Sequence, residues 1–128
     1  MNPSSQFSSA TLRQAMGLFL TTYPAVAQAD TGPVAGDLHP LALTYQGQVF
    51  YPRFQFATQG PFTLLSAFRD VLASLREGGM SDWEIAFWLT TRNTYLQGKL
   101  PILCLQQRDR LLMAIQWELD DNGLQGIG

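Results

Sequence analysis

Charged side chains are scarce in this sequence of 128 residues, at 14% of the chain, against about a quarter in ordinary soluble domains. Only eight residues are lysine or arginine, no two of them are adjacent, and the net charge is −2. A protein that binds DNA or RNA by itself neutralises phosphates with clustered basic side chains. We therefore expect no autonomous nucleic-acid binding. A weakly charged surface is often partly covered by another protein, so we expect a protein partner.

Cysteine is nearly absent, and long apolar runs are missing altogether. A single cysteine, Cys104, excludes an internal disulfide framework and is typical of a reducing compartment. No apolar run approaches the roughly 20 residues that span a bilayer. The first ten residues lack the basic and apolar regions of a secretory signal. These absences predict a cytoplasmic protein without a membrane segment.

Residues that build catalytic or cofactor sites are equally rare. The one histidine, His39, has no serine, cysteine or aspartate at a spacing that suggests a catalytic device. Cys104 lies between leucines, as a small buried hydrophobic residue does. The sequence contains no glycine-rich phosphate loop and no cluster of metal ligands. We expect no catalytic residue, no cofactor and no metal, and we predict that the chain is not an enzyme.

Hydrophobic residues make up 46% of the chain, which is enough to bury a core at this length. Residues 9–23 repeat apolar side chains at helical spacing, and Pro24 is expected to end that helix. Residues 24–40 are rich in alanine, glycine and proline, which predicts a linker. We therefore divide the chain into an N-terminal helix with its linker, 1–40, and a second region, 41–128.

Two β-prone runs meet at Gln46-Gly47, which predicts an antiparallel hairpin. The second run contains the aromatic string VFYPRFQF, which begins at Val49. Pro52 cannot donate to a β-ladder, so we expect this strand to lie at a sheet edge or to break there.

In the aromatic string, apolar residues alternate with residues that have a polar group. Successive side chains of an extended chain point to opposite faces. One face is expected in the core and the other is expected to meet solvent or a partner. The first holds Phe50, Pro52, Phe54 and Phe56, and the second holds Tyr51, Arg53 and Gln55.

Further helices are expected downstream. Residues 61–77 form an apolar stripe, with Pro61 at the first helical position and Gly78 at the position just past the end. Ser81 and Glu84 match a capping box for the next helix. Asn93 is expected to cap a short turn.

The last part of the chain predicts a short helix that opens at Pro101, a final helix over 109–119, and a tail. The sequence thus predicts a mainly α (α+β) fold: a small helical domain with a short antiparallel β-hairpin before the C-terminal helices.

The string EIAFWLTTRNTYLQGKLPILCL fits the spacing W-L-x3-N-x2-L-x-G-x2-P-x3-L. This spacing resembles the toxin-binding domain of antitoxins of the Xre/MbcA/ParS type. The upstream YPRFQF resembles the F/Y-P-x-F-Q-F segment that often precedes that domain, and the resemblance covers residues 48 to about 119. The residues that match, here called the family pattern, are Tyr51, Pro52, Phe54, Gln55, Phe56, Trp88, Leu89, Asn93, Leu96, Gly98, Pro101 and Leu105.

We expect the family-pattern residues to be mainly structural, with Trp88 and Leu89 in the core, Asn93 as a cap, Gly98 in a turn and Pro101 at a helix start. The function comes from the resemblance. It implies binding of a cognate toxin, commonly of the RES class that degrades NAD, and silencing by coverage of the toxin's active-site cleft.

The resemblance also implies that the C-terminal end, here residues 119–128, enters that cleft. Acidic side chains there would suit basic groups that line a nucleotide site. The candidate toxin contacts are Asp120, Asp121, Asn122, Gly123, Leu124 and Arg53. Family members often dimerise, so a homodimer or a hetero-oligomer with the toxin is expected.

Many antitoxins of this family also have an N-terminal helix-turn-helix. Residues 1–40 predict one helix and a linker, which is too little for a DNA-reading module. We therefore do not expect this chain to repress its own promoter alone. Other hypotheses are an immunity protein against a delivered NAD-consuming effector, a toxin-less interaction or regulatory module of the same fold, and a nucleic-acid regulator that uses the aromatic strand. An enzyme ranks last.

Overall fold

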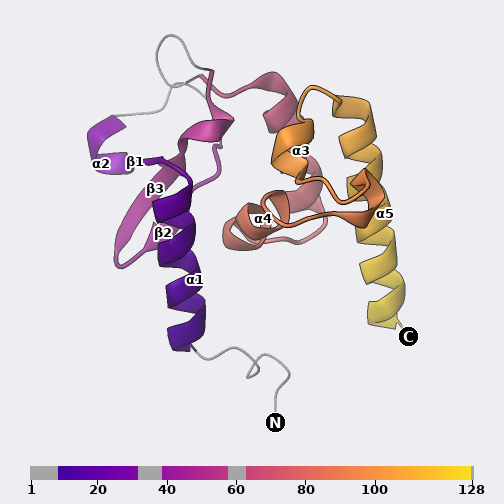
Figure 1. Cartoon of the computed structure of the whole chain (residues 1–128), viewed down its shortest axis with the longest axis horizontal. Helices are drawn as coiled ribbons and strands as arrows, with labels where there is room; N and C mark the ends of the chain where they lie inside the picture. The colour runs from indigo at the N-terminus through magenta and orange to yellow at the C-terminus, as the bar shows by residue number, and fades with distance from the viewer. Residues whose placement is uncertain (1–8, 32–38, 58–62, 128) are drawn as a thin grey trace. The chain divides into compact units, whose positions relative to one another are not determined.

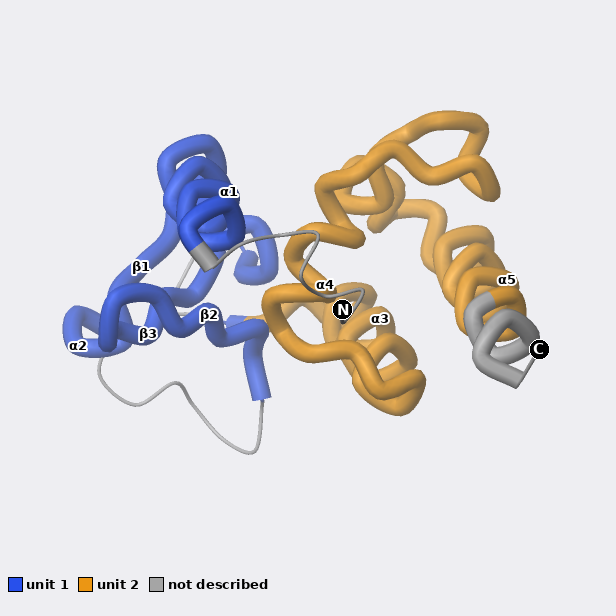
Figure 2. Tube along the Cα trace, turned by 90° about the horizontal axis from the view of Figure 1, so that it is seen from below, with its two compact units in different colours: residues 1–63 blue, residues 64–128 orange. Residues whose placement is uncertain are grey.

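The computed structural model describes residues 9–31, 39–57 and 63–127, and the side chains of residues 10–31, 39–57 and 63–121. The chain forms two compact units, residues 1–63 and 64–128 (Figure 2). Residue 40, the boundary expected from composition, lies inside the first unit. Helices dominate and one small antiparallel sheet is present, so the predicted mainly helical α+β class is confirmed.

The first unit is built on a three-stranded sheet of β1 (Ala25–Ala27), β2 (Leu43–Tyr45) and β3 (Gln48–Pro52) in the order β1-β3-β2. The predicted hairpin joins β2 to β3, with Tyr45 opposite Gln48. Its two turn residues both have positive φ, 52° at Gln46 and 80° at Gly47. That conformation suits a two-residue hairpin whose twist matches its strands.

One expectation for this unit is wrong, and another is met by only one of its two alternatives. The segment expected to be only a linker contains β1 and the short helix α2 (Gln28–Thr31). Because β1 pairs with β3, Pro52 belongs to the central strand and not to an edge. Pro52 is the last residue of β3, and the 3₁₀ helix η2 (Arg53–Gln55) follows it. The strand therefore ends there, which was the alternative expectation for this proline.

Helix α1 (Ser9–Thr22) lies beside the β2–β3 hairpin (Figure 1). Phe19 on this helix is buried. Gly17 allows the close approach, because a Cβ at this position would lie 2.8 Å from the hydroxyl oxygen of Tyr45. The helix matches the expected span to within one residue at its end.

The second unit contains α3 (Ser66–Glu77), α4 (Asp82–Leu89), the 3₁₀ helices η3 (Thr94–Leu96) and η4 (Pro101–Cys104), and α5 (Arg108–Ile127). Helix α5 packs against α3, η3 and η4. No helix in the described ranges is long and apolar enough to cross a membrane. The fully buried side chains of the second unit include Phe68, Val71, Leu75, Ile85, Leu89, Leu111 and Ala114.

Helix α3 ends at Glu77 as predicted, but its start and the glycine just past its end differ from the prediction. It begins at Ser66, and the predicted start at Pro61 lies outside the described residues. At the other end Gly79, with φ 89°, takes the left-handed position that was predicted for Gly78. The amide of Met80 donates to the carbonyl of Leu75 at 3.2 Å, which is the long bond of a Schellman motif.

Helix α4 begins with the predicted capping box. The Ser81 hydroxyl accepts from the amide of Glu84 at 3.2 Å, and the Glu84 carboxylate accepts from the amide of Ser81 at 2.9 Å. An ion pair between Arg76 and Asp82, 3.0 Å long, joins the end of α3 to the start of α4. These contacts are local in sequence, and they set the connection between the two helices.

Helix α5 is longer than the predicted 109–119, because it continues to Ile127. Asp120 and Asp121 therefore lie within a helix and not in a tail. Gly123 disfavours a helix by about 1 kcal/mol relative to alanine, but it does not end this one. The expected tail is corrected to the last turns of α5.

Candidate functional site

The C-terminal part of the family pattern forms the internal frame of the second unit. Leu89 on α4 and Leu96 on η3 are buried. Pro101 opens η4, as predicted, and is also buried. Leu105 follows η4 and is half-buried. These side chains fill or bound the core of the unit, so the spacing of the pattern reflects packing.

Asn93 organises the loop of residues 93–99. Its side-chain oxygen accepts from the amide of Tyr95 at 2.9 Å, which confirms the predicted cap. Its backbone amide donates to the carbonyl of Lys99 at 3.1 Å, and its carbonyl accepts from Gly98 at 2.8 Å. Gly98 has φ 80°, a conformation that costs glycine little. Asn93 is therefore a buried structural residue, only 6% exposed.

Trp88 differs from the expectation that it fills the core. Its ring is half-buried, and its Nε1–H donates to the carboxylate of Glu118 at 3.1 Å. The indole thus links α4 to α5 through a polar contact. The indole N–H of a tryptophan usually has a hydrogen-bond partner when the ring is partly buried.

The upstream part of the family pattern lies in the first unit, and here the expected polar face is wrong. Gln55 is fully buried: its Nε2 donates to the carbonyl of Leu41 at 3.0 Å, and its Oε1 accepts from the amide of Leu41 at 2.7 Å. Tyr51 is buried too, and its hydroxyl accepts from Gln28 at 2.8 Å. The strand ends at Pro52 and η2 turns the chain, so the alternation of faces stops. Arg53 alone of the three side chains is exposed.

Phe54 and Phe56 of the same segment pack inside the first unit, as expected, whereas Phe50 is half-buried and lines the surface groove described below. Phe54 presents its ring edge-on to Phe19, with centroids 6.4 Å apart, and to Tyr23, 5.9 Å apart. Phe56 is buried and meets Tyr51 edge-on at 6.4 Å. The aromatic string is therefore an element of the core and does not offer a platform on which bases stack.

The candidate toxin contacts lie in both units. Arg53 belongs to the first unit, whereas Asp120 and Asp121 are exposed on α5 of the second. The Asp120 carboxylate accepts from the side-chain amide of Gln116 at 3.2 Å. The remaining candidates are on the backbone of α5, and their side chains lie outside the described residues: Asn122, Gly123 and Leu124.

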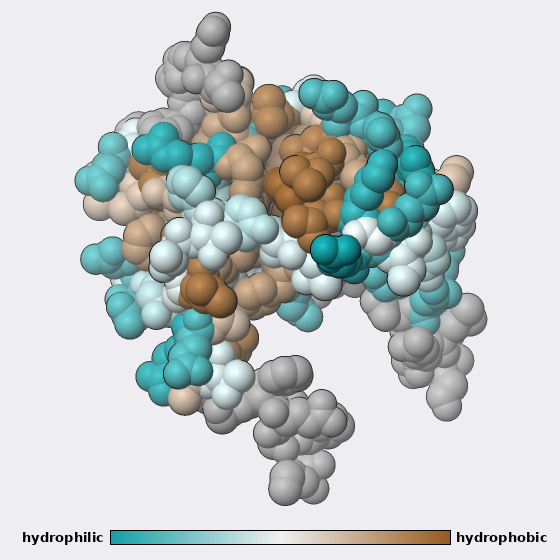
Figure 3. Space-filling view, in the orientation of Figure 1, coloured by the Kyte–Doolittle hydropathy of each residue, from teal (hydrophilic) through white to brown (hydrophobic). Residues whose placement is uncertain are grey.

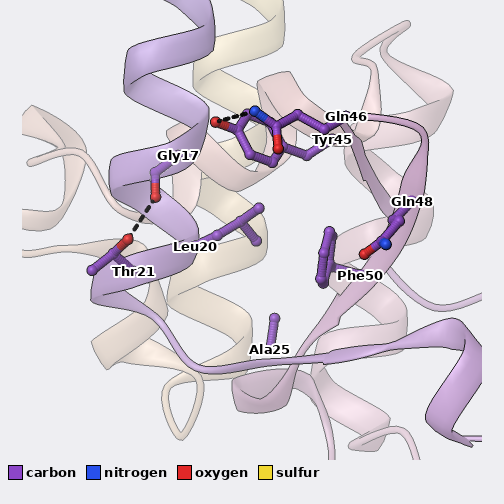
Figure 4. A pocket seen from close by; sticks show the side chains of 8 residues that line it. All are labelled: Gly17, Leu20, Thr21, Ala25, Tyr45, Gln46, Gln48 and Phe50. Carbon is purple, nitrogen blue, oxygen red and sulfur yellow. Dashed lines mark hydrogen bonds between the residues drawn. The ribbon is translucent and has the colours of Figure 1, made fainter.

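Each unit also has a surface groove that the sequence did not indicate. In the first, a groove of about 490 Å³ lies between α1 and the hairpin (Figure 4). Leu20, Ala25 and Phe50 point into it, and Tyr45 and Gln46 form its rim. None of its eight lining residues is charged.

The groove of the second unit, about 570 Å³, is bounded by η4 and by the residues around the start of α3. Leu103 at its side is 76% exposed. Figure 3 shows hydrophobic side chains gathered over η4, the short orange helix of Figure 1. Periodicity gives no sign of this exposure, because η4 is too short for a stripe.

Among the described residues, Arg76 and Arg108 form ion pairs with aspartates. Arg108 binds Asp70 at 2.6 Å, and this hydrogen bond is the main cause that raises the pKa of the Arg108 guanidinium above its ordinary value. Cys104 is buried in η4, and His39 is exposed. Within the described ranges, no three His, Cys, Asp or Glu side chains lie close enough to hold a metal ion.

Comparisons of the chain with protein-family models, with curated proteins and with solved structures find no match.

Proposed function

We propose that this chain is an antitoxin-like protein that binds a RES-type, NAD-degrading toxin and silences it by covering the toxin's active-site cleft. The observation that carries the proposal is the family pattern over residues 88–105. Several of its positions are demanding: Asn93 and Gly98 close one loop, and Pro101 opens the next helix. If the match were due to chance, we would not expect each of these residue types to fall at a position where the backbone requires that type.

The exposed carboxylates of α5 also support the proposal. Asp120 and Asp121 face solvent, and no lysine, arginine or histidine occurs from residue 111 to the end of the sequence. A cleft that binds the pyrophosphate of NAD is expected to hold basic side chains, to which such a surface is complementary. The proposed mechanism is steric exclusion of NAD, with no chemistry performed by this chain.

Location and partners follow from the same composition. The single cysteine favours a reducing compartment such as the cytoplasm. The low charge and the unclustered basic residues favour a protein that acts on another protein. DNA binding, where it occurs, would then depend on a complex and not on this chain alone.

Co-expression tests the proposal. The chain is produced together with a RES-type toxin, and growth and co-purification on a tag are both measured. We expect growth to be restored and the two proteins to purify together. Unrelieved toxicity, with no toxin retained by the tagged chain, would contradict the proposed function.

The contact surface is tested separately with Asp120→Asn/Asp121→Asn. Both side chains are exposed, and among the described side chains of α5 the buried ones precede them, so the fold should be kept. We expect toxin affinity to fall about tenfold, as for a lost pair of interfacial charges. The matched control is Asp109→Asn at the other end of α5. If the double variant and the control bind the toxin equally well, the contact lies elsewhere, and Arg53 is the next candidate.

A further inference from the structure

The outward face of α5 has an ordered stripe of side chains that the unit does not use for its own core. The stripe, here called the α5 stripe, consists of Arg110, Met113, Trp117 and Asp120, with spacings of three, four and three residues. All four are exposed; Met113 is 55% and Trp117 is 47% accessible. This spacing is the one that two helices use when they pack along a shared seam.

The opposite face of α5 holds the unit together, because Leu111, Ala114 and Ile115 are buried. Two contacts fix the stripe itself. The ring of Tyr95 packs on that of Trp117, with centroids 5.6 Å apart. Gln116 donates to Asp120, as described above. A large exposed aromatic side chain that is already held in place loses little conformational entropy on binding, which is typical of an interface anchor.

The stripe is self-complementary in one arrangement. We propose that α5 pairs in antiparallel fashion with α5 of a second copy of this chain. The twofold axis crosses the exposed face of the helix at the level of residue 115. Residues at equal distances on either side of 115 then meet. Met113 packs on Trp117 of the second copy, and Arg110 pairs with Asp120 of the second copy. The twofold axis repeats both contacts, as an isologous interface requires.

The charges identify the occupant as a second copy in this orientation. Arg110 and Asp120 have opposite charges and are each five residues from the centre of the stripe. A parallel pair would place Arg110 beside Arg110, which is unfavourable. Among the described residues Arg110 forms no ion pair, whereas Arg76 forms one and Arg108 forms two. The proposal is tested without the toxin. It uses Asp120, which is also a candidate toxin contact, so the toxin and the second copy would compete for this carboxylate.

Sedimentation velocity of the purified full chain over a concentration series tests the interface. We expect the wild type to pass from the monomer mass to twice that mass as concentration rises. Arg110→Asp and Asp120→Arg should each remain monomeric, because each places like charges together. An equimolar mixture of these two variants should recover the dimer, because each then offers the charge that the other lacks. Arg69→Asp, a reversal at an exposed position of α3, should dimerise like the wild type.

Met113→Ser gives a second measurement that changes no charge. We expect its dissociation constant to rise at least about fivefold, in line with loss of an apolar anchor. Circular dichroism establishes that each variant keeps its helix content. A wild type that stays monomeric would overturn the proposal. So would single variants that still dimerise, or a mixture that does not, since the interface would then lie elsewhere.

Discussion

Each of the two units holds a loop with a buried side-chain amide, but over very different distances along the chain. In the first unit Gln55 bonds both backbone groups of Leu41, 14 residues away. In the second unit Asn93 bonds the amide of Tyr95, two residues away, and the loop is otherwise closed by backbone bonds. The first contact fixes tertiary structure, whereas the second fixes a turn. Loss of the first should therefore cost more.

The largest effect is expected for Gln55→Leu. This change leaves the amide and the carbonyl of buried Leu41 without partners, each at about 1–3 kcal/mol. We expect the free energy of unfolding to fall by about 3 kcal/mol, measured by urea denaturation. Gln48→Leu, at an exposed glutamine of the same unit, is the matched control and should change little. A loss for Gln55→Leu no greater than that of the control would remove the contrast between the units.

Asn93→Ala should have a smaller effect, about 1.5 kcal/mol, because it removes one capping bond while the backbone bonds of the loop remain. Asn93→Asp keeps the capping oxygen and should recover part of that stability. The same denaturation experiment measures both. If Asn93→Ala costs more than Gln55→Leu, the ranking of long-range over local contacts is wrong.

Trp88→Phe sharpens the comparison within the second unit. Phenylalanine keeps an aromatic ring at this position but removes the bond from Nε1–H to Glu118. We expect a loss of about 1 kcal/mol. Because the bond joins α4 to α5, a double-mutant cycle with Glu118→Ala isolates it. A coupling energy near zero would show that the bond contributes nothing.

Arg108→Gln is expected to have the smallest effect. Its pairs with Asp70 and Asp109 lie at the surface, and such pairs are screened by salt and contribute little. We expect the denaturation midpoint to stay within error of the wild type at physiological salt. A clear fall that persists at high salt would indicate that this arginine has a structural role that its exposure does not suggest.

Sequence signals that act over a few residues predicted the local structure well. The capping box of Ser81 and Glu84, the cap at Asn93 and the turn at Gln46-Gly47 all form as expected. Each depends on bonds between near neighbours, so the sequence contains all the necessary partners.

Several of the failures depend on groups far away in the sequence. Ala25–Ala27 becomes a strand because β3 offers it an edge, and alanine itself has no preference for strands. Tyr51 is buried and bonded to Gln28, 23 residues away. Gln55 is buried because the chain turns after Pro52 and its side chain bonds Leu41, 14 residues away. The candidate site shows the same limit. Exposure of Trp117 on α5 follows from which face the unit buries, and the sequence alone does not give it.

The most direct test of the proposed function is inhibition of NAD hydrolysis in a purified system. The RES-type toxin is assayed for NAD loss while this chain is titrated from substoichiometric to excess amounts. We expect hydrolysis to fall in proportion to the added chain and to stop near a fixed ratio, as steric coverage of a cleft requires. Unchanged NAD turnover with the folded chain in excess would contradict the proposal.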